Sequence, residues 1–131
     1  MSNTYRVIVI GGGVVGSSVL YHLAKLGWTD VCLLERSVLT AGSSWHAAGG
    51  IHALNADPNM ASLQAYTIDL LSEIQTESGQ DIGLSMTGGI TVASAPARWE
   101  WLQSAYRIFQ TIGIEDCYLM TPQDIKDKCP I

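Results

Sequence analysis

The stretch that decides the fold is residues 7–16, VIVIGGGVVG, in which a short apolar run ends in a cluster of glycines. The run itself is rich in β-branched residues and predicts a buried strand. Gly11, Gly13 and Gly16 then follow the spacing G-x-G-x-x-G, which forms the turn between a strand and a helix around a bound dinucleotide. In such a turn Gly11 permits the change of direction, Gly13 lets a pyrophosphate approach the backbone, and Gly16 lets the helix pack closely on the strand.

A complete βαβ unit is predicted around these glycines, over about residues 5–36. Leucines at helical spacing follow the turn, and Gly27 is placed to end the helix in a left-handed cap. The backbone N–H groups of Val14 and Val15, at the start of this helix, are expected to face the phosphates. Residues 30–34, DVCLL, predict the second, buried strand.

Glu35 follows the second strand, nineteen residues after Gly16. A carboxylate at this place accepts hydrogen bonds from the hydroxyls of an adenosine ribose, and its charge disfavours a 2′-phosphate. The unit therefore predicts FAD or NAD rather than NADP, and it does not separate the first two because both carry the same ADP half. The structural alternative is that Glu35 only solvates the end of a strand.

A second informative segment is residues 41–50, AGSSWHAAGG, which places a histidine among serines, alanines and glycines. The glycines allow the backbone to lie against a flat ring, and the serines offer hydroxyl and N–H groups to a pyrophosphate or ribityl chain. A neutral imidazole is a nucleophile near pH 7, so His46 has the chemistry needed to add to an electrophilic flavin.

From Glu35 to its end, the chain resembles the glycine and D-amino-acid oxidase superfamily of FAD-dependent amine oxidoreductases. Within it, residues 41–49 resemble the flavin-attachment segment of the dimethylglycine dehydrogenase and sarcosine dehydrogenase group. In that group the histidine of the Ser-(Ser/Thr)-Trp-His-Ala-Ala-Gly run carries the flavin through its 8α-methyl carbon. This histidine corresponds to His46, so the resemblance implies covalently bound FAD. The alternative is that His46 only packs over the cofactor or hydrogen-bonds to it.

The resemblance also implies a reaction, namely oxidation of the N-methyl group of a small amine such as dimethylglycine or sarcosine, with hydride transfer to the flavin. The implied electron acceptor is oxygen or an electron-transfer flavoprotein, and tetrahydrofolate would bind only through a region absent here. No catalytic base is expected in this portion. Two alternatives stay open: a noncovalent FAD amino-acid or amine oxidase of the same superfamily, and a non-catalytic NAD- or FAD-binding module.

The predicted cofactor-binding residues belong to the glycine turn, to the end of the second strand, or to the flavin-attachment loop at about residues 41–52. They are Gly11, Gly13, Val14, Val15, Gly16, Glu35, Arg36, Gly42, Ser43, Ser44, Trp45, His46, Ala47, Ala48, Gly49 and Gly50.

Composition limits the other possibilities. The net charge of −5 argues against nucleic acid and against an anionic membrane surface, and no apolar stretch has membrane-spanning length. No cluster of histidine, cysteine or carboxylate side chains has metal-ligand spacing. The three scattered cysteines predict reduced thiols. Because the first strand begins within a few residues of the start, no room is left for a signal or transit peptide, and a cytoplasmic location is expected.

The residues after position 50 predict a mixture of helices and short strands. Helices are expected from Asp57 to about Glu77, from near Pro96 to before Gly113, and from Thr121 onward; strands or a hairpin are expected over 82–92, and a short strand over 118–120. Aromatic residues on the middle helix predict core packing rather than a cage for a methylated amine.

The predicted fold class is α/β: a Rossmann-like FAD-binding βαβ unit followed by mixed α+β segments. Residues 1–131 are expected to form the N-terminal part of an oxidoreductase domain. The later strands and the substrate domain would be missing, because the dinucleotide fold needs more than two parallel strands.

Overall fold

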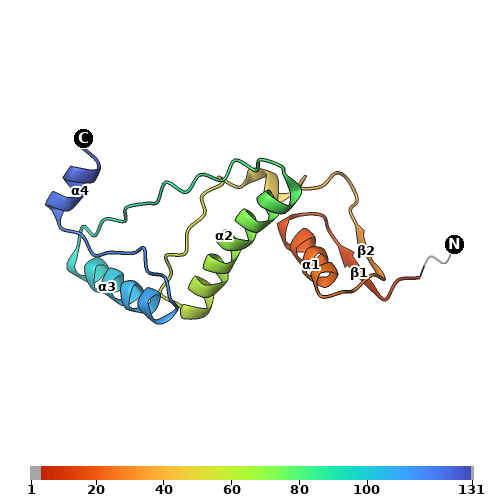
Figure 1. Cartoon of the computed structure of the whole chain (residues 1–131), viewed down its shortest axis with the longest axis horizontal. Helices are drawn as coiled ribbons and strands as arrows, with labels where there is room; N and C mark the ends of the chain where they lie inside the picture. Colours follow the sequence, from red (N-terminus) through yellow and green to blue (C-terminus); the bar gives the residue numbers. More distant parts are fainter. Residues whose placement is uncertain (1–3, 131) are drawn as a thin grey trace. The chain divides into compact units, whose positions relative to one another are not determined.

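The computed structural model describes residues 4–130 and divides into two units, Met1–Gly50 and Ile51–Ile131. The first unit contains β1 (Val7–Ile10), α1 (Val14–Lys25), β2 (Val31–Leu34) and the short 3₁₀ helix η1 (Ser43–His46); the second contains α2 (Pro58–Ser78), α3 (Pro96–Thr111) and α4 (Pro122–Lys128) (Figure 1). The α/β class and the N-terminal βαβ unit predicted from the sequence are confirmed.

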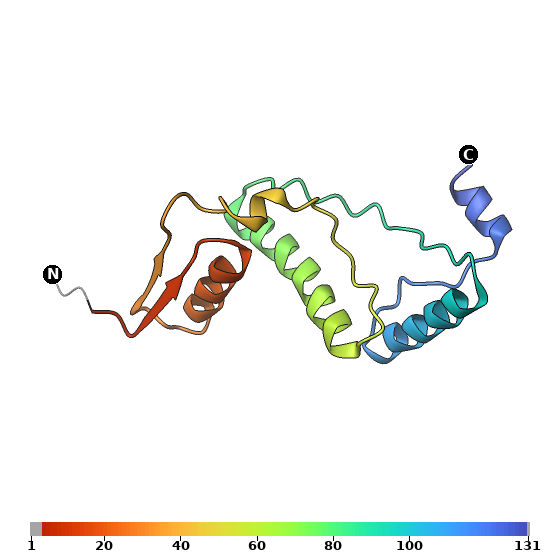
Figure 2. The same cartoon turned by 180° about the vertical axis from the view of Figure 1, so that it is seen from behind.

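The first unit is built on two parallel strands. β1 pairs with β2 in the register that sets Val7 opposite Val31 and Ile10 opposite Leu34. Helix α1 connects the strands and packs against both of them, as Figures 1 and 2 show. The ladder extends by one bond into the glycine turn, where the Gly11 N–H donates to the Leu34 carbonyl over 2.8 Å. The turn is therefore anchored at the carboxyl ends of both strands.

Two glycines have the roles that their spacing predicts. Gly11 has a φ of +103°, a backbone conformation that side chains with a Cβ rarely adopt. A Cβ added to Gly16 would collide with the carbonyl oxygen of Gly11 and would lie 3.4 Å from Val9 Cγ1. Because backbone fills this space, no side chain rearrangement can make room. The absence of a side chain at Gly16 is what lets α1 lie against β1.

The sheet of the first unit is only part of a dinucleotide-binding sheet. Ile10 is 85% exposed and Ile8 is 48% exposed, although strands of parallel sheets are normally covered on both faces. The β-branched character of β1 therefore fits a central strand whose remaining neighbours are not among the described residues. This agrees with the expectation of an incomplete domain.

The helices of the second unit begin at recognisable caps. The Asp57 carboxylate accepts a hydrogen bond from the Met60 N–H over 2.9 Å, and Gly79 ends α2 with a φ of +66°. At α4, Thr121 and Asp124 form a capping box, in which each side chain accepts a hydrogen bond from the backbone N–H of the other residue. All three helices expected after residue 50 are confirmed.

The core of the second unit is small and lies between α2 and α3. Ala61 and Leu70 come from α2, and Leu102, Ala105 and Phe109 come from α3. The sequence predicts a wider apolar face on α2 that includes Met60 and Leu63, yet these side chains are 45% and 57% exposed. That part of the prediction is wrong for the described residues, because no element among them covers this side of the helix.

The strands predicted over 82–92 and 118–120 are absent from the described residues. Figure 2 shows the long connection between α2 and α3 running without a helix or strand. A strand requires a hydrogen-bonding neighbour, and the described chain offers none to these segments. Positive φ values at Gly83 (+71°) and Gly88 (+73°) also interrupt the extended course of the first segment.

Candidate functional site

Glu35 is held at the carboxyl edge of the two-stranded sheet by the glycine turn itself. One carboxylate oxygen accepts a hydrogen bond from the Gly12 N–H over 2.7 Å, and the other accepts from the Ser37 N–H over 2.9 Å. These bonds, chiefly the one from Gly12, lower the pKa of Glu35 below its usual value. The side chain is therefore negatively charged and oriented at neutral pH, and unused lone pairs on both oxygens can still accept ribose hydroxyls.

Gly12 is a functional position that the glycine spacing alone does not identify, because the pattern G-x-G-x-x-G accepts any residue there. It is the buried residue of the turn, and a Cβ on it would lie 2.5 Å from Leu39 Cδ2 and 3.2 Å from Glu35 Cβ. Its N–H binds Glu35, and its carbonyl accepts from the Thr40 N–H over 2.9 Å. The signal in the sequence that could have identified Gly12 is the run of three consecutive glycines at positions 11–13.

Ser44 joins the loop at about residues 41–52 to the glycine turn. Its hydroxyl oxygen accepts a hydrogen bond from the Val14 N–H over 2.8 Å, and it lies 3.1 Å from the place that a Cβ on Gly13 would occupy. The sequence predicts that the Val14 and Val15 N–H groups face the phosphates together. In the structure the Val14 N–H donates to the Ser44 hydroxyl, whereas the Val15 N–H has no acceptor among the described residues.

Thr40 is a second link between the two segments, and no sequence signal points to it. It has a φ of +66°, which is strained for a β-branched residue. Its N–H donates to the Gly12 carbonyl, and its own carbonyl accepts from the Trp45 N–H over 3.1 Å. This unusual backbone conformation lets the Thr40 N–H bind the glycine turn while the Thr40 carbonyl binds the loop that contains Trp45.

His46 closes the 3₁₀ turn η1, and its ring is held by the turn's own backbone. Nδ1 lies 3.1 Å from the carbonyl oxygen of Gly42. A carbonyl oxygen only accepts, so Nδ1 carries the proton and donates it. In the neutral ring the lone pair is therefore on Nε2, the ring nitrogen that does not bind the Gly42 carbonyl.

The first unit has an open hollow of about 510 Å³ beside these groups, lined by Glu35, Arg36, Ser37, Ala41 and Gly42. The structure thus brings the end of β2 together with the start of the loop at about residues 41–52. The remaining predicted residues of the loop are exposed: Trp45, Ala47, Ala48, Gly49 and Gly50. Two of them are tied into the turn through their backbone, since the Trp45 N–H donates to the Thr40 carbonyl and the Ala47 N–H to the Ser44 carbonyl. Gly49 has a φ of +75°. Ser43 starts η1 and is exposed as well.

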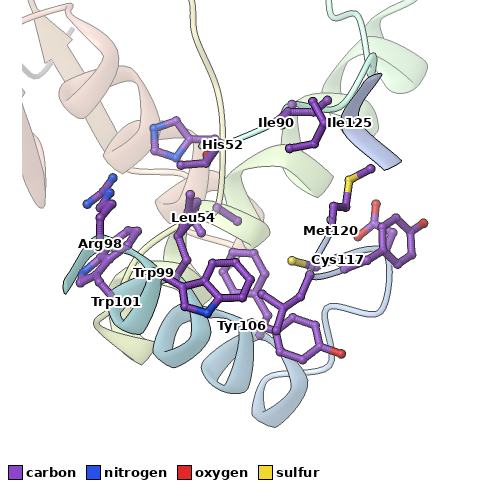
Figure 3. Close-up of a pocket in the computed structure, with 18 residues that line it drawn as sticks. His52, Leu54, Ile90, Arg98, Trp99, Trp101, Tyr106, Cys117, Met120 and Ile125 are labelled. Atoms are coloured by element: carbon purple, nitrogen blue, oxygen red, sulfur yellow. The ribbon is translucent and has the colours of Figure 1, made fainter. Parts of the chain in front are cut away.

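The second unit contains a cavity of about 600 Å³ between α3, the residues around His52 and the residues around Tyr118 (Figure 3). Trp99, Trp101 and Tyr106 of α3 line it, and the Arg98 guanidinium stacks on Trp101 at 4.0 Å from the ring centroid. Leu102 and Phe109 also line the cavity, and both belong to the core. The cavity is thus a loosely filled extension of that core, as the helical spacing of the aromatic residues predicts.

Two further properties concern metals and membranes. Over residues 4–130, no group of three or more histidine, cysteine or acidic side chains is arranged to hold a metal ion. None of the helices in the described chain has both the length and the apolar character that a membrane crossing requires. The cysteines at positions 32, 117 and 129 form no disulfide among the described residues.

Several known proteins are related to this chain in sequence. The chain is 38% identical to the mitochondrial dimethylglycine dehydrogenase of Homo sapiens, over 96% of this chain and 14% of that protein. It is 35% identical to the mitochondrial sarcosine dehydrogenase of Homo sapiens, over 100% of this chain and 14% of that protein. It is 34% identical to the formaldehyde-forming 4-methylaminobutanoate oxidase of Paenarthrobacter nicotinovorans, over 96% of this chain and 15% of that protein. The chain therefore spans only about 14% of the length of the first relatives.

A solved structure shares the fold. The crystal structure of L-proline dehydrogenase from P. horikoshii superposes with a TM-score of 0.85 and 23% identity, covering 99% of this chain and 34% of that one. The likeness confirms the incomplete α/β fold, since the chain corresponds to a third of that larger protein.

The relatives contradict the predicted cytoplasmic location, because the dimethylglycine and sarcosine dehydrogenases are mitochondrial proteins. The prediction rested on the short distance between the first residue and β1, and that distance does not report on the compartment.

The family comparison supports the cofactor class. Residues 6–131 match the pattern of the DAO family, described as FAD dependent oxidoreductase. This chain, with its glycine turn, Glu35 and His46 loop, belongs to the DAO family of FAD-dependent oxidoreductases.

Proposed function

We propose that the protein containing this chain oxidises the N-methyl group of a small amino acid through FAD bound covalently to His46. The similar proteins named above act on dimethylglycine, sarcosine and 4-methylaminobutanoate, which all carry an N-methyl group and a carboxylate. When bound, FAD would supply the two-electron acceptor for the N-methyl carbon, so that oxidation followed by hydrolysis would give formaldehyde and the demethylated amine. Oxygen or an electron-transfer flavoprotein would be the final electron acceptor.

The observation that carries the covalent part of this proposal is the hydrogen bond between His46 Nδ1 and the Gly42 carbonyl. It selects the tautomer whose Nε2 lone pair is available, so the ring is nucleophilic without first losing a proton from that nitrogen. The ring is also exposed at the end of η1. An imidazole that served only for packing would need neither property.

The other residues of the site fit the ADP half of the same cofactor. The Glu35 carboxylate is oriented to accept ribose hydroxyls, and the Val15 N–H at the start of α1 is available to a pyrophosphate oxygen. The hollow beside Glu35 and Arg36 has room for the nucleotide. These residues bind and orient the cofactor, and no proton transfer is assigned to them.

The test compares the full-length protein with its His46→Ala variant after denaturation in acid. We expect flavin absorbance and added mass to stay with the parent polypeptide and to be absent from the variant polypeptide. Flavin released into the supernatant by both would limit His46 to packing and would indicate a noncovalent amine oxidase. Binding of NAD with no flavin in either protein would contradict the enzymatic proposal altogether.

A further inference from the structure

The hydrogen bond between Val14 and Ser44 spans thirty residues and connects the two cofactor-binding segments of the first unit. At one end is the first helical N–H of α1, which follows the glycine turn directly. At the other end is the hydroxyl of a half-buried serine, two residues before His46. The absence of a side chain at Gly13 favours this approach, since a Cβ there would lie 3.1 Å from the Ser44 oxygen, which is a tight contact.

The bond leaves the Ser44 hydroxyl able to act as a donor. A hydroxyl that accepts an N–H through its oxygen still has its own proton to donate, and no acceptor for this proton is found among the described residues. The start of α1 favours negative charge because its N–H groups point outward. Ser44 therefore uses the N–H of Val14 and has an O–H of its own to offer at the start of α1.

The same serine is part of the turn that orients His46. Within that turn, the Gly42 carbonyl accepts hydrogen bonds from the Trp45 N–H over 3.2 Å and from His46 Nδ1 over 3.1 Å. The turn is attached to the glycine segment through Ser44 and through the Thr40 N–H, which binds the Gly12 carbonyl. Of these two attachments to the glycine segment, the one through Ser44 comes from a side chain, so it can be removed without altering the backbone.

We propose that Ser44 is a positioning residue that couples pyrophosphate binding to the orientation of His46 and so sets the rate of flavin attachment. This rests on the proposed covalent function. In the attachment, His46 Nε2 forms a bond to the 8α-carbon of the flavin, while one hydrogen leaves that carbon and one leaves the imidazole. The two electrons released reduce the flavin, and dioxygen takes them up with two protons to give hydrogen peroxide.

The experiment uses the full-length protein prepared without flavin, with FAD added to start the reaction. Acid-precipitated flavin gives the attachment rate, and titration with ADP gives the affinity for the nucleotide half alone. We expect Ser44→Ala to slow attachment roughly tenfold or more and to weaken ADP binding several-fold, because one hydrogen bond and the alignment of the turn are lost. Ser44→Thr keeps the hydroxyl and should restore both values.

Ser17→Ala is the matched control, since it removes an exposed hydroxyl from α1 that forms no hydrogen bond within the described residues. It should attach flavin at the parent rate. Should Ser44→Ala fail to fold, Ser44→Cys replaces it, because a thiol fills the same space and hydrogen-bonds weakly.

Different results would overturn the two proposals. Equal attachment rates and equal ADP affinities in the parent and the alanine or cysteine variant would overturn the role of Ser44 and leave the covalent function standing. If the parent protein never retains flavin, the covalent proposal is wrong. If, in addition, Ser44→Ala or Ser44→Cys binds ADP as tightly as the parent, the role of Ser44 at the pyrophosphate is wrong as well. A threonine variant as slow as the alanine variant would likewise contradict a role for the hydroxyl.

Discussion

At the residue scale, the first unit is held by a few polar atoms that each bind two segments of the chain. Glu35 is an example, because its two oxygens accept from Gly12 in the first turn and from Ser37 after β2. Its negative charge is thus stabilised by backbone dipoles before any cofactor binds. The same bonds orient the carboxylate for the ribose, so binding requires little rearrangement of the side chain.

The lowered pKa of Glu35 makes a prediction about acid stability. A carboxyl whose pKa is lower in the folded state than in the unfolded chain stabilises the fold at pH values above its usual pKa of 4.5. That contribution is lost as the pH falls through the lowered pKa. We therefore expect Glu35→Gln to be less stable than the parent near neutral pH and to lose less stability on acidification.

The measurement is the urea midpoint of the full-length protein between about pH 3 and pH 7. Glu77→Gln, on an exposed position of α2, is the control and should follow the parent curve. Parallel curves for the parent and Glu35→Gln would show that the backbone hydrogen bonds do not hold Glu35 in its charged form.

At the element scale, the helices begin and end where short-range signals place them. Asp57 caps a helix of 21 residues, and Gly79 ends it in the left-handed conformation. The Thr121 and Asp124 pair starts α4 in the same local manner. Strands behave differently, since the segments around 82–92 and 118–120 have apolar alternation and yet form no ladder among the described residues. A helix satisfies its own backbone, whereas a strand depends on a neighbour.

The cap at Asp57 can be tested by replacement. Asp57→Ala removes the acceptor for the Met60 N–H and should lower the free energy of unfolding by about 1 kcal/mol. Asp57→Asn keeps an acceptor oxygen and should lose clearly less. Chemical unfolding of the full-length protein measures both variants, and equal losses would mean that the hydrogen bond is not the source of the stability.

At the scale of the whole molecule, the described chain buries few side chains completely and leaves apolar strands uncovered. The core consists of Ala61, Leu70, Leu102, Ala105 and Phe109, all in the second unit, while Ile10 and Val15 of the first unit are largely exposed. A small core gives little free energy to set against the entropy of ordering the chain. The relatives are about seven times longer, and further polypeptide is the natural cover for these surfaces.

We therefore expect residues 1–131, expressed alone, to fold poorly and to bind flavin weakly. The measurements are a urea titration followed by circular dichroism, binding of a hydrophobic dye, and titration with FAD, each compared with the full-length protein. A broad transition, strong dye binding and weak FAD binding are expected. A stable monomer that unfolds cooperatively and binds FAD tightly would contradict this prediction.

Much of the candidate site could be predicted because its chemistry depends on residue type and spacing. The glycines at positions 11 and 16, the carboxylate after β2 and the histidine among small residues are all visible in the sequence. Gly12 and Thr40 were not predicted, because their roles come from hydrogen bonds to residues more than twenty positions away. The hydrogen bond from the Val14 N–H to Ser44 was not predicted for the same reason, since the two residues are thirty positions apart.

The βαβ unit and the three later helices follow from the sequence alone, which also points to His46 as the proposed attachment residue. These follow from local rules: strand and helix periodicity, glycine at positions that exclude a Cβ, and caps that satisfy backbone groups within a few residues. Only the tertiary structure decided which atoms meet across the chain. It paired Ser44 with Val14, directed Glu35 to Gly12 and left Nε2 of His46 as the available nitrogen, because such contacts depend on where distant segments are brought together and not on any spacing along the chain.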